Sequence, residues 1–172
     1  MAYEDQKDVI FDTTTVKYVG IFSFSELYAH CKKWIMSEID PNEFEEGNYS
    51  EKTPSSGKLI DITWTFKKKF TNYFAFTGSI KFRTVNMKKV EVERDGKKIQ
   101  MDQGEVYVKI KGHLVRDYKN QFNDSKMRQK LRGIYNKWII GSKVDKYEGK
   151  IIDLSERFLA STKEFLELEG KR

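Results

Sequence analysis

Aromatic residues and lysines alternate along two stretches in the middle of the chain, residues 64–70 and 73–83. On an open sheet this pattern would let exposed rings stack on bases while the cations contact a phosphate backbone. In the alternative interpretation the rings are core and the lysines form the solvated face of a strand, which strict alternation also produces. The pattern is therefore typical either of a nucleic-acid site or of an ordinary half-buried sheet.

The distribution of charge is likewise compatible with a nucleic-acid site or with an ordinary fold. The net charge is +6 at pH 7, but Lys and Arg far outnumber Asp and Glu only within residues 58–150, whereas residues 1–57 are acidic. Such asymmetry is typical of a chain with a polyanion partner, or of two segments that attract each other. The cations that would bind nucleic acid or another anionic surface are Lys67, Lys68, Lys69, Lys81, Arg83, Lys109, Lys111, Lys126, Arg128, Lys130 and Arg132.

No recognised nucleic-acid motif accompanies these cations. The chain has no aromatic RNA-binding signature, no zinc-finger spacing and no glycine loop of the kind those modules use. The basic run at 126–137 is also compatible with contact to lipid headgroups. More often such a run is a solvated helix face, part of which Glu43, Glu45 and Glu46 could neutralise here.

Few residues could support covalent or metal chemistry. His30 and Cys31 are neighbours in the sequence, so on a helix their side chains point about 100° apart and cannot face each other. Cys31 also falls on apolar positions, where a free cysteine behaves as a small hydrophobic residue. It is the single cysteine, which excludes an internal disulfide and a cysteine-rich zinc site. A metal site built on His30 or His113 would need carboxylates from elsewhere.

The sequence therefore predicts no catalytic residue, no metal site and no cofactor. It contains no nucleophile elbow, no phosphate-binding glycine loop and no dinucleotide fingerprint. The carboxylates Asp61, Asp102, Glu105 and Asp117 lie on strands or turns, and no two of them stand out as an acid and base pair.

The first elements expected are a strand at 9–20 and a helix that starts at Ser23. Glu26 completes a capping box with Ser23, and Phe22 and Leu27 can form a hydrophobic staple. The helix should end near Asp40-Pro41, since the residue before proline resists helical geometry. The stretch 40–57 contains both prolines and several glycines and serines, which predicts a long loop.

From residue 58 the apolar period changes to two, which predicts antiparallel strands with one apolar face and one wet, basic face. Asp95-Gly96 is a strong hairpin signal within this region. Two helices should follow, at 124–140 and 147–168. Their apolar stripes are Met127, Leu131, Ile134, Tyr135 and Trp138 in the first, and Tyr147, Ile151, Leu154, Phe158, Phe165 and Leu168 in the second.

Ser161 occupies a position on the last helix where the spacing calls for a large apolar residue. A small side chain there leaves room for a ligand between helix and sheet, or accommodates a bulky sheet residue such as Trp64 or Phe76.

This order of elements resembles the helix-grip, or START-like, fold. In that fold a curved sheet wraps a long C-terminal helix and leaves an apolar cavity between them. The chain departs from it by having one helix after the first strand rather than two, and by the extra helix at 124–140. The phrases GHLVRDY at 112–118, LRGIY at 131–135 and FLELEG at 165–170 are also similar to small uncharacterised archaeal proteins, which bring no assigned activity.

We therefore predict a single α+β domain, residues 1–172, in which a curved antiparallel sheet of five or six strands packs on a long C-terminal helix, with two additional helices. The leading functional hypothesis is a non-catalytic domain that holds an apolar small molecule or a protein segment between sheet and helix, with residues 41–57 as a lid. The residues expected to line that site are Trp64, Phe74, Phe76, Phe158 and Phe165.

Two alternatives stay open beside this hypothesis. One is a nucleic-acid or anionic-surface binder that uses the basic 58–150 segment, and the other is a structural subunit of a larger assembly. The N-terminus has no apolar signal-peptide core and no stretch is long enough to span a membrane. With a single cysteine, these features predict a cytoplasmic protein.

Overall fold

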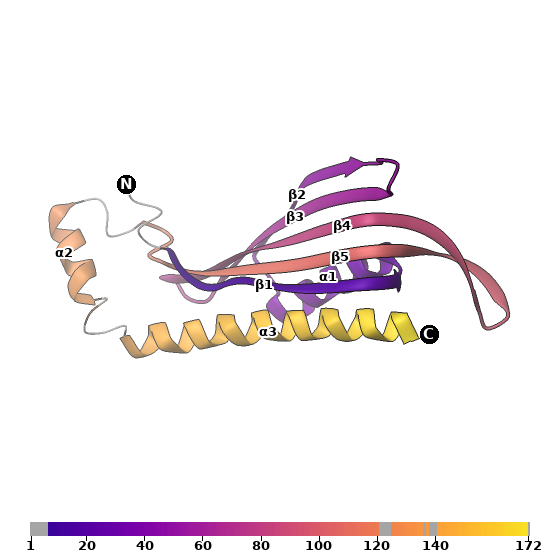
Figure 1. Ribbon diagram of the computed structural model, residues 1–172. Coiled ribbons are helices and arrows are strands. Elements are labelled where there is room, and N and C mark those ends of the chain that lie inside the picture. The colour runs from indigo at the N-terminus through magenta and orange to yellow at the C-terminus, as the bar shows by residue number, and fades with distance from the viewer. Residues whose placement is uncertain (1–6, 121–124, 136, 138–140, 172) are drawn as a thin grey trace.

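The computed structural model describes residues 7–120, 125–135, 137 and 141–171. The chain folds into five antiparallel strands and a small set of helices, an α+β architecture (Figure 1). The elements are β1 (Lys7–Phe22), α1 (Phe24–Trp34), the π-helical turn η2 (Ile35–Ile39), β2 (Glu43–Lys52), β3 (Lys58–Lys69), β4 (Phe74–Arg94), β5 (Lys97–Arg116), α2 (Lys126–Ile134) and α3 (Gly141–Lys171).

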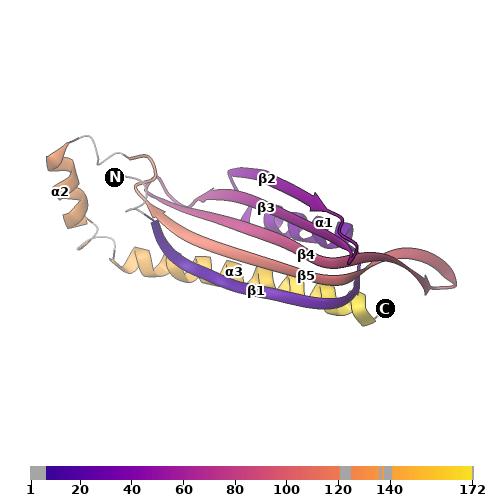
Figure 2. The same cartoon turned by 45° about the horizontal axis from the view of Figure 1, so that its top comes forward.

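The sheet has the strand order β1-β5-β4-β3-β2, so β2 to β5 form a meander and β1 joins at the far edge beside β5. Helices α1 and α3 pack on one face. Helix α3 runs along β1 and β5, while Tyr28 of α1 contacts Trp64 of β3 and Phe82 of β4. In the part of the chain that is described, the views show no helix over the opposite face (Figures 1 and 2). We call this opposite side the open face.

The predicted alternation along β3 is confirmed. Ile60, Ile62, Trp64 and Phe66 are buried toward the helices. Trp64 lies at the centre of an aromatic cluster, with ring centroids 4.7 Å from Tyr28 and 4.6 Å from Phe82. The apolar face of the sheet is therefore filled by side chains packed against α1 and α3.

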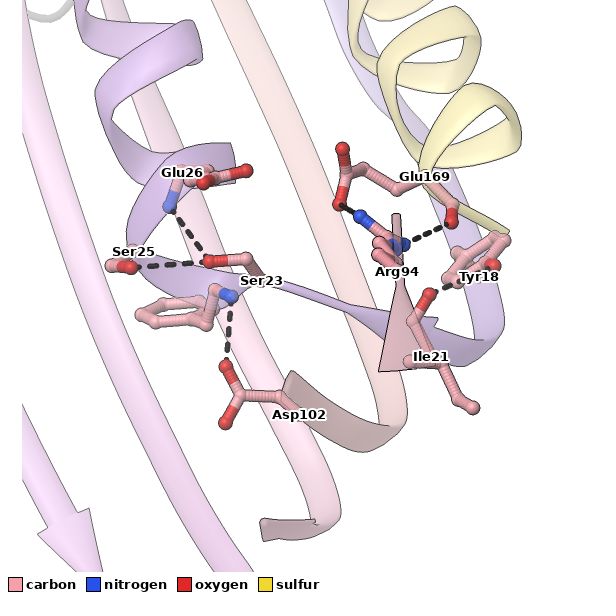
Figure 3. A network of polar contacts seen from close by, with 9 residues as sticks. Tyr18, Ile21, Ser23, Ser25, Glu26, Arg94, Asp102 and Glu169 are labelled. Atoms are coloured by element: carbon pink, nitrogen blue, oxygen red, sulfur yellow. Dashed lines mark hydrogen bonds and ion pairs between the residues drawn. The ribbon is translucent and has the colours of Figure 1, made fainter. Parts of the chain in front are cut away.

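The start of α1 follows the predicted capping signal. Ser23 is the N-cap, and its hydroxyl accepts a hydrogen bond from the main-chain N–H of Glu26 (Figure 3). Asp102 of β5 accepts a second bond, from the N–H of Phe24 at 2.9 Å. The helical segment ends at Asp40 as predicted, in a left-handed conformation with φ of 49°. The π-helical turn before it has no counterpart in the sequence-based prediction.

The prediction of a loop over residues 40–57 is wrong for most of that stretch, whereas the lid role of 41–57 stays a prediction. Residues Glu43–Lys52 form β2, an edge strand paired with β3. Its glutamates are held by basic residues of the neighbouring elements. Glu43 pairs with Lys67 at 3.7 Å, and Glu51 pairs with Lys58 at 2.7 Å. The strand therefore depends on tertiary pairing, which overrides a local composition typical of loops.

A bulge interrupts β4 between Val85 and Lys88, where Asn86 has a positive φ of 54°. Two glycines allow this backbone to come close. A Cβ on Gly104 would lie 2.9 Å from the Cα of Met87, and one on Gly57 would lie 2.6 Å from the carbonyl carbon of Asn86. Bulges increase local twist and bend a strand. The bulge lies beside Lys58, the first residue of β3, which pairs with Met87, so β4 bends where its pairing with β3 ends.

From the Val90 and Met101 pair onward, the described strands β4 and β5 pair with each other alone and form a ribbon that ends at the predicted Asp95-Gly96 turn. The sequence pattern predicted shorter runs, whereas the two strands have 21 and 20 residues. Arg94, next to the turn, donates to the main-chain carbonyl of Glu169 at 2.9 Å and pairs with its carboxylate at 3.4 Å (Figure 3). The ribbon is thus fastened to the C-terminal end of α3.

The long C-terminal helix is confirmed, and its buried side includes Ile151, Leu154 and Phe158 as predicted. Leu168 was expected on that side but is 52% exposed. It lies about 80° from Phe158 around the helix axis. Leu166 and Glu169 are buried in its place.

Candidate polyanion-binding face

The centre of the open face is built from alternate residues of β3, β4 and β5. On β4 these are Ser79, Lys81 and Arg83, whose neighbours in the chain point into the core. Strand register places Lys109 of β5 directly opposite Lys81, and Tyr107 opposite Arg83. The sheet therefore gathers cations from two strands into adjacent cross-strand positions.

Three of these cations have no counter-charge. Lys81, Arg83 and Lys109 form no ion pair or hydrogen bond through their side chains with any residue that the structure describes. Asp61 lies opposite Arg83 in register but is not paired with it. By contrast, Lys17 on the same face pairs with Glu105 at 3.4 Å. The uncompensated charge is thus local rather than a property of the whole face.

A shallow depression of about 500 Å³ lies over these cations. It is lined by Thr15, Lys81, Arg83, Val85, Tyr107 and Lys109. Tyr107 is oriented by a hydrogen bond that its hydroxyl donates to Glu105 at 2.7 Å, and the Lys17 ammonium lies 5.3 Å from the centre of its ring. The hydrogen bond from Tyr107, and to a smaller extent the interaction with Lys17, holds the pKa of Glu105 below its usual range.

A second depression, of about 840 Å³, lies on the open face toward β2. Its walls include the hydroxyls of Thr65, Thr77 and Ser79 and the side chains of Lys67 and His113. Ser79 and Lys81 are successive outward positions on β4, so the two depressions occupy adjacent rows of the sheet. Hydroxyls and ammonium groups are both donors to phosphate oxygens. Glu43 and Glu45 also line the second depression, so the donors gather in the rows of β4 and β5 rather than at the β2 edge.

The structure brings together some of the predicted polyanion residues and separates others. Lys67, Lys69, Lys81, Arg83, Lys109 and Lys111 occupy outward positions of the open face. Lys68 points to the other side, where its ammonium donates to the main-chain carbonyl of Asp40 at 2.6 Å. Lys126, Arg128, Lys130 and Arg132 lie on α2, apart from the sheet (Figure 1). Thr15, Val85 and Tyr107 are lining residues that the sequence did not predict.

The five residues predicted to line an apolar pocket lie in the packed layer between sheet and helices. Trp64, Phe74, Phe76 and Phe158 are buried. Phe165 is half-buried, and its ring stacks on His30 with centroids 4.6 Å apart. None of the five lines the depressions described here. A ligand among them would have to separate side chains that now touch, and the apolar-ligand hypothesis stays a prediction.

Ser161 faces α1 rather than the sheet. Its hydroxyl lies 2.9 Å from Nε2 of His30. Burial holds the pKa of His30 below its usual value. A serine and histidine in contact suggest nucleophilic chemistry, but Ser161 lies inside a continuous helix, where main-chain N–H groups are already hydrogen-bonded and cannot form an oxyanion hole. We interpret the pair as a link between α1 and α3.

Cys31 is buried, as its place on the apolar stripe predicted. Its sulfur lies 3.7 Å from the hydroxyl of Thr162 on α3. Burial raises the pKa of the thiol to about 12, so the thiol is neutral at physiological pH. A neutral, enclosed thiol is a weak nucleophile and a poor metal ligand.

Within the described ranges, no three His, Cys, Asp or Glu side chains come together as metal ligands. Comparisons with protein-family models, with curated proteins and with solved structures found no match.

Proposed function

We propose that the protein binds nucleic acid through the open face of its sheet. The observation that supports this most directly is the cross-strand group of Lys81, Arg83 and Lys109, whose three positive charges lie in one depression and pair with no described acidic residue. Like charges placed opposite each other on a sheet are destabilising. A polyanion would compensate these charges and release counterions in the process.

Nucleic acid fits this face better than a lipid surface does. The depression over Lys81, Arg83 and Lys109 is lined mainly by cations and hydroxyls, which can contact phosphates and sugars along a strand. The ring of Tyr107 beside Arg83 offers a stacking partner for one base. Among the described residues, none of the exposed large apolar side chains lies in the central rows of this face, so nothing there resembles a surface that inserts between lipids.

The test is a titration of labelled single-stranded and duplex oligonucleotides, followed by fluorescence anisotropy between about 50 and 200 mM NaCl. We expect Lys81→Ala, Arg83→Ala and Lys109→Ala, combined, to lower affinity and to reduce the slope of log K against log salt by about two to three. The matched control carries the same charge change on α3, as Lys143→Ala, Lys146→Ala and Lys163→Ala. Equal losses in both triple variants, or no binding by the unaltered protein, would contradict the proposal.

The apolar-ligand hypothesis, with its helix-grip-like cavity, is kept as the second candidate because α3 lies along the apolar face of the sheet. Native mass spectrometry of the protein purified from its own cells distinguishes the two. A small bound mass that survives high salt supports the apolar ligand, whereas nucleic acid that is removed by high salt supports the open face. We place either activity in the cytoplasm, since the one cysteine is reduced and buried.

A further inference from the structure

Helix α2 carries an exposed apolar side. Met127 is 74% exposed, Leu131 49% and Ile134 56%. Their spacing places all three on the same side of the helix. In Figure 1, α2 stands apart from the sheet at the end of the molecule where α3 begins. The helix is nevertheless a defined element, because the hydroxyl of Ser125 caps it by accepting from the N–H of Arg128 at 3.2 Å.

Cations flank this apolar side on both edges. Lys126 and Lys130 follow one edge of the stripe, and Arg128 and Arg132 follow the other. Lys126 and Arg128 lie in the first turn, which contains no acidic residue. The helix macrodipole disfavours positive charge there. The positive charges of the first turn therefore do not contribute favourably to the helix dipole.

We propose that α2 docks on a bilayer surface that contains anionic lipids. Met127, Leu131 and Ile134 would insert between headgroups, while the flanking cations contact lipid phosphates and carboxylates. Such a surface places anionic headgroups beside apolar acyl chains. The headgroups match the cations at the two edges of the exposed side of α2, and the acyl chains match its apolar centre. Nucleic acid offers the charge without an apolar layer, and a second α2 would bring like charges together.

The geometry also indicates how the helix would lie. Among the residues that the structure covers, no helix is long and apolar enough to cross a membrane. Tyr135 follows directly after α2 and contacts the ring of Tyr73, with centroids 5.6 Å apart, which connects the end of the helix to the turn between β3 and β4. The helix would therefore lie in the plane of the interface, with the sheet held beside it.

The experiment is co-sedimentation of the intact protein with unilamellar vesicles of phosphatidylcholine, with or without phosphatidylserine. We expect binding only to the vesicles with phosphatidylserine. Met127→Gln, Leu131→Gln and Ile134→Gln, combined, should lower partition by about tenfold or more, since these side chains no longer leave water. Lys126→Ala with Lys130→Ala should lower it by roughly 30-fold, at about fivefold for each cation.

The controls separate this proposal from neighbouring ones. Ile152→Gln and Leu168→Gln remove exposed apolar side chains of α3 and should leave vesicle binding unchanged. Oligonucleotide binding should persist in the α2 glutamine variant, because the open face is intact. Absence of binding to anionic vesicles overturns the proposal, as does equal binding by the glutamine variant. Sedimentation velocity that shows a dimer lost in that variant would also overturn it, in favour of a second copy as the partner.

Discussion

Lys81 and Lys109 lie directly opposite each other on β4 and β5, on the face that no described helix covers. Two ammonium groups in this relationship repel each other, and repulsion is weakest when solvent or a ligand screens them. Neither forms an ion pair with a described residue. The two lysines therefore lower the stability of the free protein, and binding of an anionic ligand would offset that loss.

Replacement of one member of this pair should stabilise the protein. We expect Lys109→Thr to raise the free energy of unfolding by about 0.5 kcal/mol, because it removes a like-charge contact and introduces a residue with high strand propensity. Urea denaturation at low salt measures the change. The same variant should bind oligonucleotides more weakly than the unaltered protein.

Lys17→Thr is the matched control for that substitution. Lys17 is on the same face but pairs with Glu105 at 3.4 Å. Its replacement should therefore not raise stability. A gain as large as that of Lys109→Thr would mean that general charge reduction, and not the cross-strand pair, is responsible.

Glycine positions test how closely the sheet is packed. A Cβ on Gly78 would lie 2.3 Å from the ring of Phe66, so Gly78→Ala should destabilise by about 1–3 kcal/mol. At Gly149 in α3 no described atom lies within 4 Å of the added carbon. Gly149→Ala should stabilise by about 0.5–1 kcal/mol through helix propensity. Thermal or urea unfolding of both variants measures the difference, and effects of the same sign would contradict the packing described here.

Alkaline pH should weaken the fold through Cys31. Burial raises the pKa of its thiol from 9.0 to about 12. Well below pH 9 the thiol is protonated in both the folded and the unfolded protein, so the stability that its burial provides is fully present. As the pH rises through this window the unfolded chain ionises first, so stability should fall by up to about 1.4 kcal/mol per pH unit until the folded pKa is passed.

Cys31→Ala isolates this effect. Urea midpoints of the two proteins between pH 8 and pH 10 should converge, because only the unaltered chain has the thiol. A constant difference across that range would show that the thiol does not carry the alkaline sensitivity.

The contact of Arg94 with Glu169 should control the motion of the β4–β5 ribbon. Glu169 is 6% exposed, so Arg94→Ala leaves a nearly buried carboxylate without its partner. We expect amide hydrogen exchange in residues 88–101 to accelerate by about tenfold or more. Lys98→Ala removes an exposed ion pair with Glu91 on the same ribbon and should change exchange little. Equal acceleration in the two variants would argue against a specific attachment.

Local signals in the sequence predicted those elements whose causes are local. The N-cap at Ser23, the turn at Asp95-Gly96 and the alternation along β3 depend on residues close together in the sequence, and all three are confirmed. The strand β2 was missed because its stability comes from pairing with Lys58, Lys67 and the rest of β3, which its own composition does not reveal. The bulge at Asn86 was missed for a similar reason, as the glycines that admit it lie on other strands.

The candidate site was predicted in part. Alternation alone could distinguish Lys67 and Lys69 from Lys68, whose ammonium contacts Asp40 on the other side of the sheet. The direct opposition of Lys81 and Lys109 depends on the register between β4 and β5, which one sequence does not specify. The separation of α2 from the open face likewise depends on where the chain goes after β5.

The position of β1 determines the order in which the fold can assemble. Among the described elements, β1 and α1 are synthesised before the other strands, yet β1 pairs with β5, the last of these strands to be made. The strands between them can form stepwise as hairpins, each beside the one before it. The nascent β1 therefore stays unpaired, with its apolar residues exposed, until β5 has been made. At this stage chaperone binding or premature association competes with completion of the sheet.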